Sequence, residues 1–252
     1  MGINWDEQAQ QFSSDHYRTT RGQTRLLVLL DQVESVLPSF PISIIDVGSG
    51  PGHLAIEMAK RGHFVTCIEP SSSMRTIMRE TLDNCPKAVT DRIHLLDANL
   101  QGASQAVGGQ GYDLVMCHAV LMYLPDLASS ITALTGLMNK TGRLSVVTRN
   151  KAAQVFKYAE RSDWNSVLGA LRGERSEHPL HRAHAIQELQ EELDRNDLDL
   201  DIWYGVRTFT ESYADDTLGQ PDEELLAAEI MAAKMSPYRD ISHLIHLMAR
   251  RR

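Results

Sequence analysis

The fold of this chain is decided by one stretch, Ile44-Ile45-Asp46-Val47-Gly48-Ser49-Gly50-Pro51-Gly52-His53-Leu54. A short apolar run ends at an acidic residue, passes through three closely spaced glycines and continues into a helical pattern. Glycine lets the backbone turn sharply and approach a ligand without a Cβ in the way. This order predicts a strand, a tight turn and the N-terminus of a helix, a common binding site for nucleotide-like ligands.

Strands and helices are expected to alternate on both sides of this stretch. Two helices are predicted in residues 1–42, a basic and partly apolar helical insertion in 150–183, a helix over 184–196 and an acidic helix near 222–234. The predicted strands cover 43–47, 64–69, 92–97, 112–118, 143–148, 198–209 and 243–250, with helices beginning near Gly52, Ser71 and Asp126. Such alternation predicts an α/β fold with a parallel sheet, and a ligand at the carboxyl ends of its strands.

The composition is that of an ordinary globular protein. The 252 residues are 42% hydrophobic and 23% charged, and no apolar run approaches the ~20 residues of a membrane span. Residues 1–7 lack the basic and apolar blocks of a signal peptide, so we expect a cytoplasmic protein without a membrane partner. The net charge of −8 argues against broad nucleic-acid binding, although it leaves room for a local basic cleft.

No metal site is expected from the cysteine and histidine patterns. Cys67, Cys85 and Cys117 are odd in number and unclustered, which disfavours both a disulfide framework and a zinc site. The run His178-Pro179-Leu180-His181-Arg182-Ala183-His184 is rich in histidine, but its spacing fits no standard zinc motif, so we interpret it as a solvated loop.

Polar residues at the ends of the next three predicted strands make the interpretation of the glycine turn more specific. Glu69 ends the next strand, where a carboxylate can accept both hydroxyls of a ribose. Asp97, followed by Ala98 and Asn99, ends the third strand, in a position suited to an adenine amino group. The fourth strand ends at His118, whose place at a carboxyl end favours a functional role over simple packing.

With these residues in place, the sequence resembles the class I S-adenosylmethionine-dependent methyltransferases. The resemblance rests on Asp46-x-Gly48-x-Gly50-x-Gly52, Glu69, Asp97 and the Tyr-Asp-Leu-Val strand beginning at Tyr112. It implies a Rossmann-like sheet of seven mostly parallel strands with an antiparallel C-terminal hairpin, and S-adenosyl-L-methionine as cofactor with S-adenosyl-L-homocysteine as product. The implied cofactor-binding residues are Arg25, Asp46, Gly48, Ser49, Gly50, Glu69, Asp97, Ala98 and His118.

Flanking stretches resemble a narrower group, the bacterial tRNA 5-carboxymethoxyuridine methyltransferases. They are Tyr17-x-Thr19-Thr20-Arg21-Gly22-Gln23-x-Arg25, His118-Ala119-Val120-Leu121, Gly205-Val206-Arg207-x-Phe209, and Pro237-Tyr238 followed by Ile245-His246. Enzymes of that group esterify the carboxylate of a modified wobble uridine, which makes a tRNA anticodon loop the implied partner. The resemblance places Arg25 on the methionine carboxylate of the cofactor and His118 beside the methionyl arm.

The expected organisation is a single domain over 1–252. Residues 43–149 would form the cofactor-binding core and 184–252 a C-terminal helix with the strand hairpin, while 1–42 and the insertion 150–183 would form a lid over the acceptor. An ionised carboxylate needs no general base, so we expect positioning by Tyr17, Arg149 and Arg207 rather than a catalytic residue. For both arginines a surface salt bridge is an equal alternative.

Two other functions remain open. Methylation of a small metabolite is favoured by the acidic net charge and by the short run Arg172-Gly173-Glu174-Arg175, which stands where the tRNA-modifying group has more lysines. A non-catalytic cofactor-binding regulatory protein would keep the same fold and transfer nothing.

Overall fold

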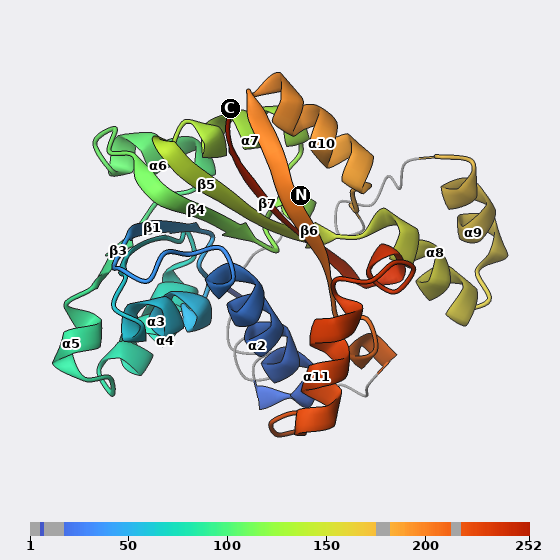
Figure 1. The fold of residues 1–252 in the computed structure, drawn as a ribbon, viewed down its shortest axis with the longest axis horizontal. Helices are drawn as coiled ribbons and strands as arrows, with labels where there is room; N and C mark the ends of the chain where they lie inside the picture. The colour runs from blue at the N-terminus through green and yellow to red at the C-terminus, as the bar shows by residue number, and fades with distance from the viewer. Residues whose placement is uncertain (1–5, 8–17, 175–181, 213–217) are drawn as a thin grey trace.

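The computed structural model describes residues 6–7, 18–174, 182–212 and 218–252. Its centre is a seven-stranded sheet in the order β3-β2-β1-β4-β5-β7-β6 (Figure 1). The five strands from β3 to β5 run parallel, whereas β7 is antiparallel to both β5 and β6. The parallel sheet and the antiparallel C-terminal pair predicted for this chain are therefore confirmed. The strands are β1 (Ser43–Val47), β2 (Phe64–Ile68), β3 (Ile93–Leu96), β4 (Tyr112–His118), β5 (Met138–Arg149), β6 (Leu198–Val206) and β7 (Leu244–Arg251).

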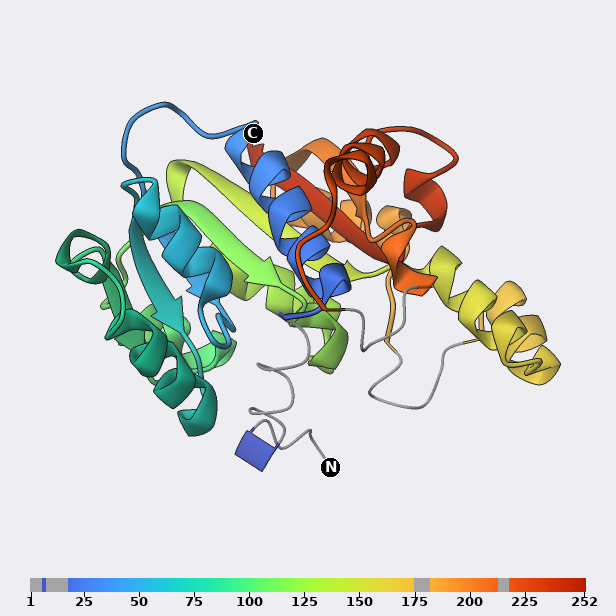
Figure 2. The same cartoon turned by 90° about the horizontal axis from the view of Figure 1, so that it is seen from below.

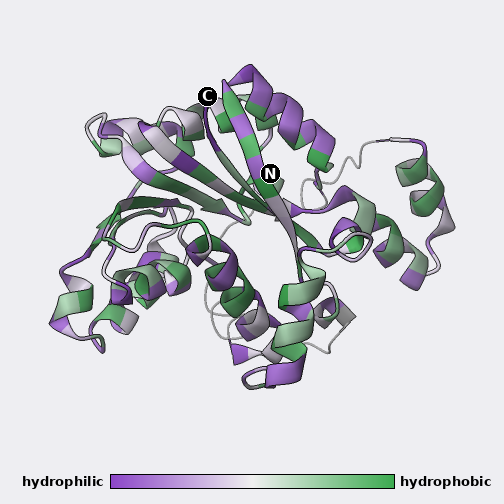
Figure 3. Cartoon of the chain, in the orientation of Figure 1, coloured by the Kyte–Doolittle hydropathy of each residue, from purple (hydrophilic) through white to green (hydrophobic). Residues whose placement is uncertain are grey.

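Helices cover both faces of the sheet. One face packs against α6 (Leu100–Ala106), α7 (Leu127–Thr135) and α10 (Ile186–Arg195), and the other against α2 (Thr20–Glu34), α3 (His53–Lys60) and α4 (Ser72–Leu82). Successive strand residues serve opposite layers, so Ile44 packs under α2 and α3 while Ile45 packs toward α6 and α7. Burial on both faces explains why hydrophobic residues are concentrated where the central strands run between the helical layers (Figure 3).

The remaining helices lie around the edges of this three-layer core. The short α5 (Lys87–Thr90) precedes β3, and α11 (Glu223–Ala232) packs beside α2. α8 (Lys151–Glu160) and α9 (Trp164–Leu171) form a hairpin that extends away from the sheet (Figures 1 and 2). Short 3-10 turns in the described part of the chain are η1 (Leu121–Tyr123), η3 (Thr210–Ser212) and η4 (Arg239–Ile241).

Two strand boundaries, the start of β5 and the end of β6, differ from those predicted from the sequence. β5 begins at Met138 instead of residue 143, because Gly142 lets the strand approach Tyr112, whose carbonyl oxygen would lie 2.7 Å from an added Cβ. β6 ends at Val206 instead of residue 209, because Arg207 has φ 61 and breaks the extended backbone. The helix α6, which begins behind the Asn99 cap, was not predicted because Gly102 interrupts its pattern.

Some predictions fall outside the described residues. The first of the two predicted N-terminal helices falls largely in residues 1–17, of which only Asp6 and Glu7 are described. The histidine run overlaps the undescribed 175–181, but its last residue, His184, is buried with Nδ1 2.9 Å from Oγ1 of Thr148, so the solvated-loop interpretation is wrong for this residue. Within the described chain, no helix has the length and apolar character that a bilayer span requires.

Candidate functional site

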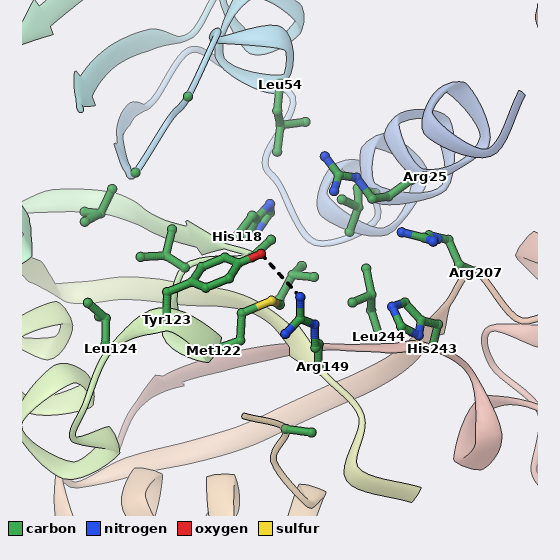
Figure 4. Close-up of a pocket in the computed structure, with 18 of the residues that line it drawn as sticks. Arg25, Leu54, His118, Met122, Tyr123, Leu124, Arg149, Arg207, His243 and Leu244 are labelled. Carbon is green, nitrogen blue, oxygen red and sulfur yellow. Dashed lines mark hydrogen bonds between the residues drawn. The ribbon is translucent and has the colours of Figure 1, made fainter. Parts of the chain in front are cut away.

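A cavity of about 780 Å³ opens at the carboxyl ends of β1, β4 and β5, within the size range of ligand pockets. β1 lies between β2 and β4, so the chain reverses its direction of progress through the sheet at this point. Crevices at such a switch point are the usual ligand sites of open α/β sheets. The cavity is walled by the glycine turn, α2, the η1 segment, α8 and the first residues of β7 (Figure 4).

The glycine turn presents open space to the cavity at one position only. A Cβ added to Gly48 would lie 2.4 Å from Cγ2 of Val120, and one added to Gly52 would lie 2.6 Å from Met78. At Gly50, which has φ 57, an added Cβ would meet nothing within 4 Å. Gly48 and Gly52 therefore pack the turn against the protein, whereas Gly50 leaves backbone accessible to a ligand.

Glu69 is fixed by two backbone donors. Its Oε2 accepts a hydrogen bond from the Gly50 N–H at 2.8 Å, and its Oε1 accepts one from the Ser71 N–H at 2.9 Å. Only 5% of the residue is exposed, and burial raises the pKa of its carboxyl despite these donors. Each oxygen keeps a further lone pair, so this carboxylate is oriented to accept two hydroxyl groups from the cavity.

Asp46 lies beneath the glycine turn and lines the cavity. It is 4% exposed, and burial together with the charge of Glu69 raises the pKa of its carboxyl to about 7. Two buried carboxyl groups so close together disfavour a pyrophosphate or another anion at this turn.

Asp97 takes a different position from these two acids. Both of its carboxylate oxygens bind the guanidinium of Arg75, at 2.9 and 2.7 Å, and Arg75 also donates to the Glu69 carbonyl oxygen at 2.7 Å. Asp97 and Ala98 are not among the cavity-lining residues of the described chain, whereas the next residue, Asn99, is. The role predicted for Asp97 at the adenine thus stays a prediction, with Arg75 as the group that orients it.

Arg25 and His118 both line the cavity, Arg25 from α2 and His118 from the end of β4 (Figure 4). Arg25 projects from α2, four residues after Arg21 and hence on the same side of the helix. His118 ends β4, and its Nε2 lies 2.7 Å from Oγ of Ser145. Burial, with His246 and Arg25 nearby, holds the pKa of His118 well below its usual range, so the imidazole is neutral.

The side of the cavity away from the glycine turn, here named the cationic end, is strongly basic. Its cations come from α2, β5, α8 and the residue after β6, and they are Arg21, Arg149, Lys157, Arg161 and Arg207. Glu211, the carboxylate that lines this end among the described residues, pairs with both Arg207 and Lys157. Arg149 lies over the ring of Tyr123, with its guanidinium carbon 5.4 Å from the ring centroid.

The electrostatic effect of the cationic end is visible at His243. Burial, followed by the positive charges of Arg207, Lys157 and Arg149, lowers the pKa of this imidazole to about 2. His243 therefore stays neutral, and the positive potential around it favours an anion in the adjoining space.

The structure brings together most, but not all, of the residues predicted for the site. The cavity is lined by Arg25, Asp46, Gly48, Ser49, Gly50, Glu69, His118, Arg149 and Arg207. Tyr17 lies outside the described residues, and within the described ones no group of three potential ligands is placed to hold a metal ion. Sequence reasoning did not single out Glu211 or His243, because Lys157, which acts on both, is distant in the sequence.

Comparison with known proteins was consistent with this geometry. A family model described as a methyltransferase domain matches residues 45–144. The tRNA 5-carboxymethoxyuridine methyltransferase of Escherichia coli K12 is 25% identical, over 98% of this chain and 96% of that protein. The ubiquinone biosynthesis O-methyltransferase of Stutzerimonas stutzeri is 32% identical, over 45% of this chain and 47% of that protein.

Solved structures share the fold over nearly the whole chain. A magnesium protoporphyrin IX methyltransferase from Synechocystis PCC 6803 with bound SAH superposes with a TM-score of 0.62 at 15% identity, covering 95% of this chain and 86% of that one. A methyltransferase from Thermotoga maritima, described as a possible histamine N-methyltransferase, gives a TM-score of 0.60 at 11% identity, with 98% of both chains covered.

Proposed function

We propose that this chain, a class I S-adenosylmethionine-dependent methyltransferase, forms the methyl ester of 5-carboxymethoxyuridine at the wobble position of tRNA. The enzyme class and the cofactor predicted from the sequence are confirmed by the methyltransferase domain match and by the class of the relatives. The identity of the methyl acceptor is our proposal, and we infer it from the chemistry of the cavity.

The cavity residues fit the chemical groups of the cofactor. The Glu69 carboxylate, already oriented by two backbone donors, would hold the ribose hydroxyls. The open backbone at Gly50 leaves room for the cofactor to cross the turn, and Arg25 would hold the methionine carboxylate. When bound, S-adenosylmethionine supplies an activated methyl group on a sulfonium.

The observation that carries the acceptor proposal is the cationic end. A carboxylate bound there would meet several arginine and lysine side chains at the edge of the same cavity that holds the donor. Arg149 and Arg207 are suited to bidentate hydrogen bonds with it. A neutral His243 adds no proton to this environment, so an acceptor carboxylate stays ionised and nucleophilic.

The reaction then depends mainly on positioning. An ionised carboxylate attacks without loss of a proton, so no general base is required. Holding acceptor and donor in line can supply effective molarities of about 10⁵–10⁸ M. The residues of the cationic end would orient the carboxylate, and Tyr123, beneath Arg149, would restrict the guanidinium to one side of the cavity.

The α8–α9 hairpin supports a large acceptor such as an RNA loop. It begins at the cationic end, which Lys157 and Arg161 line, and continues to Trp164, whose exposed fraction is 60%. Exposed aromatic rings next to cations are the surfaces on which unpaired bases stack. We propose that this hairpin and α2 flank the bound loop, as the lid predicted for 1–42 and 150–183 would do, in a reaction that takes place in the cytoplasm.

Mass spectrometry of tRNA nucleosides from a strain that lacks this chain tests the proposal. We expect the methyl ester to disappear and 5-carboxymethoxyuridine to accumulate, with recovery on complementation. Unchanged methyl ester content would remove tRNA as acceptor and would favour the small-metabolite alternative. Formation of S-adenosylhomocysteine with any acceptor would exclude the non-catalytic alternative.

A further inference from the structure

A continuous chain of buried hydrogen bonds leads from α2 across the sheet to the cavity wall. Nε2 of Gln32 donates to the carbonyl oxygen of Gly205 at 3.2 Å, and Oε1 of Gln32 lies 2.7 Å from Nδ1 of His246. Nε2 of His246 lies 2.8 Å from Oγ of Ser145, which in turn lies 2.7 Å from Nε2 of His118. Gln32, Ser145 and His246 are each at most 1% exposed.

The direction of these hydrogen bonds is fixed at the Gly205 end of the series. A backbone carbonyl oxygen only accepts, so the amide of Gln32 must turn its NH₂ toward Gly205 and its oxygen toward His246. Nδ1 of His246 therefore carries the proton, and burial, which lowers the pKa of this imidazole to about 3, keeps its Nε2 unprotonated. Ser145 must then donate to His246, which leaves its oxygen to accept from Nε2–H of His118.

This polarity assigns the proton of His118 as well. With the proton on Nε2, Nδ1 of the neutral ring is a lone-pair acceptor. Nδ1 is buried and has no hydrogen-bond partner among the described residues, although His118 lines the cavity. A buried acceptor left unpaired costs free energy unless a ligand supplies the donor.

We propose that Gln32, His246 and Ser145 are positioning residues that hold His118 as its Nε2–H tautomer, so that Nδ1 accepts a hydrogen bond from the ammonium group of the cofactor's methionine end. The inference rests on the cofactor placement of the proposed function, with Arg25 at the neighbouring carboxylate. It is independent of the identity of the methyl acceptor. A purely structural role, in which the chain only fastens α2 to the sheet, would not depend on the direction of the hydrogen bonds.

Replacement Gln32→Glu separates these two roles because it preserves shape and, at a pH where the introduced carboxyl is ionised, reverses polarity. A protonated carboxyl would still donate to the Gly205 carbonyl oxygen and keep the native direction. A carboxylate at this position stabilises a second proton on His246, whose Nε2–H then donates to Ser145. Ser145 turns its own proton toward His118, which must move its proton to Nδ1. The site would then present a donor to the cofactor ammonium in place of an acceptor.

The tautomers are measurable by ¹⁵N NMR of histidine-labelled full-length protein, with and without S-adenosylhomocysteine. We expect His246 to carry its proton on Nδ1 and His118 on Nε2 in the native chain, and His118 to switch to Nδ1–H in Gln32→Glu. Calorimetry should show S-adenosylmethionine binding weakened by about 10- to 100-fold in this variant, the value of one hydrogen bond to a charged group.

A second variant covers the case in which Gln32→Glu does not fold. Ser145→Ala removes the link between the imidazoles, and we expect mixed His118 tautomers and about 3- to 10-fold weaker cofactor binding. Ser130→Ala is the matched control, because it removes an equally buried hydroxyl from α7, where it bonds to the Asp126 carbonyl oxygen.

Each result decides the proposal. With the introduced carboxyl ionised, an unchanged His118 tautomer in Gln32→Glu would contradict the proposed series of hydrogen bonds, and so would an unchanged tautomer in Ser145→Ala. A switched tautomer with unchanged cofactor affinity would contradict the acceptor role of Nδ1. Failure of the native chain to bind S-adenosylmethionine would instead contradict the cofactor placement, while the tautomers would still test the series of hydrogen bonds.

Discussion

Glu69 and Gly50 are joined by a hydrogen bond of 2.8 Å, which ties the residue after β2 to the turn after β1. The same carboxylate accepts from the Ser71 N–H, so the glycine turn, β2 and the start of α4 are held by one side chain. A ribose bound there would meet an acceptor whose position is set before the cofactor arrives, which lowers the ordering cost of binding.

Replacement Glu69→Ala should therefore weaken S-adenosylmethionine binding by about 10- to 100-fold, because it removes charged hydrogen bonds worth about 1.5–3 kcal/mol. Isothermal titration measures the effect. Glu57→Ala removes the same charge from α3, where Glu57 pairs with Lys60 and Arg61 at the surface, and should leave the affinity unchanged. Equal affinities of Glu69→Ala and the native chain would exclude Glu69 as the ribose ligand.

Alanine should affect two glycines of the turn in different ways. Gly50→Ala adds a methyl group to open cavity space, so we expect weaker cofactor binding and a stability loss of about 1–2 kcal/mol from the left-handed backbone. Gly48→Ala carries the same backbone cost and also meets Val120, so its loss of stability should be larger. Urea denaturation compares the stabilities of the two variants. A Gly50→Ala variant with native cofactor affinity would show that the cofactor does not lie against the Gly50 backbone.

The stability of the chain should depend on Asp46 in a defined pH window. The pKa of its carboxyl is about 7 in the folded chain and about 3.8 in an unfolded one, so folding takes up a proton between these values. The contribution of Asp46 is fully present below pH ~4 and is lost as the pH rises through ~7.

Asp46→Asn removes this titration. Its free energy of unfolding should exceed that of the native chain by on the order of 2–4 kcal/mol at pH 8, and the difference should vanish near pH 4. Denaturation curves at both pH values provide the comparison. A difference that is the same at pH 4 and pH 8 would show that Asp46 does not titrate in this window.

The arginines of the cationic end should act on the acceptor and not on the donor. Arg149→Gln and Arg207→Gln should each lower kcat/KM for a carboxylate acceptor by about 10- to 100-fold, the value of a lost charged hydrogen bond. The dissociation constant of S-adenosylmethionine should stay within about twofold of the native value. Arg79→Gln, on the exposed side of α4, is the control, and equal losses in all three variants would contradict a specific role.

Binding of tRNA should lose part of its salt dependence when the α8–α9 hairpin loses charge. If Arg161 and Arg172 each contact a phosphate, the double replacement by glutamine should reduce the slope of log K against log salt by about 1.4–1.8. Filter binding at several salt concentrations measures the slope. A slope unchanged from that of the native chain would place the RNA on another surface.

The sheet and the donor side of the cavity were predictable from local patterns. An apolar run followed by glycine predicted β1 and its functional end at Gly48, and an apolar run followed by an acidic residue predicted β2 and its end at Glu69. Both predictions were possible because each pattern lies within a few consecutive residues. The partner of Asp97 was not predictable, since Arg75 reaches it from a helix that the sequence shows only as amphipathic.

The long-range contacts of the site could not be predicted from the sequence. Gln32 and His246 are 214 positions apart, and each alone has the pattern of an ordinary core position. Glu211 likewise gains part of its significance from Lys157, which the fold brings to it from α8, whereas Arg207 lies only four positions earlier in the sequence. Pairings of this kind depend on tertiary packing, and the residue pattern of a single element carries no information about that packing.

Methyl transfer in vitro shows whether this chain esterifies the wobble uridine of tRNA. Purified chain is incubated with methyl-deuterated S-adenosylmethionine and tRNA from the deletion strain, and the digested nucleosides are analysed by mass spectrometry. We expect a deuterated methyl ester of 5-carboxymethoxyuridine with the native chain, and at least tenfold less with Arg149→Gln at equal cofactor occupancy. A native chain that binds the cofactor but leaves this nucleoside unlabelled would contradict the proposed function.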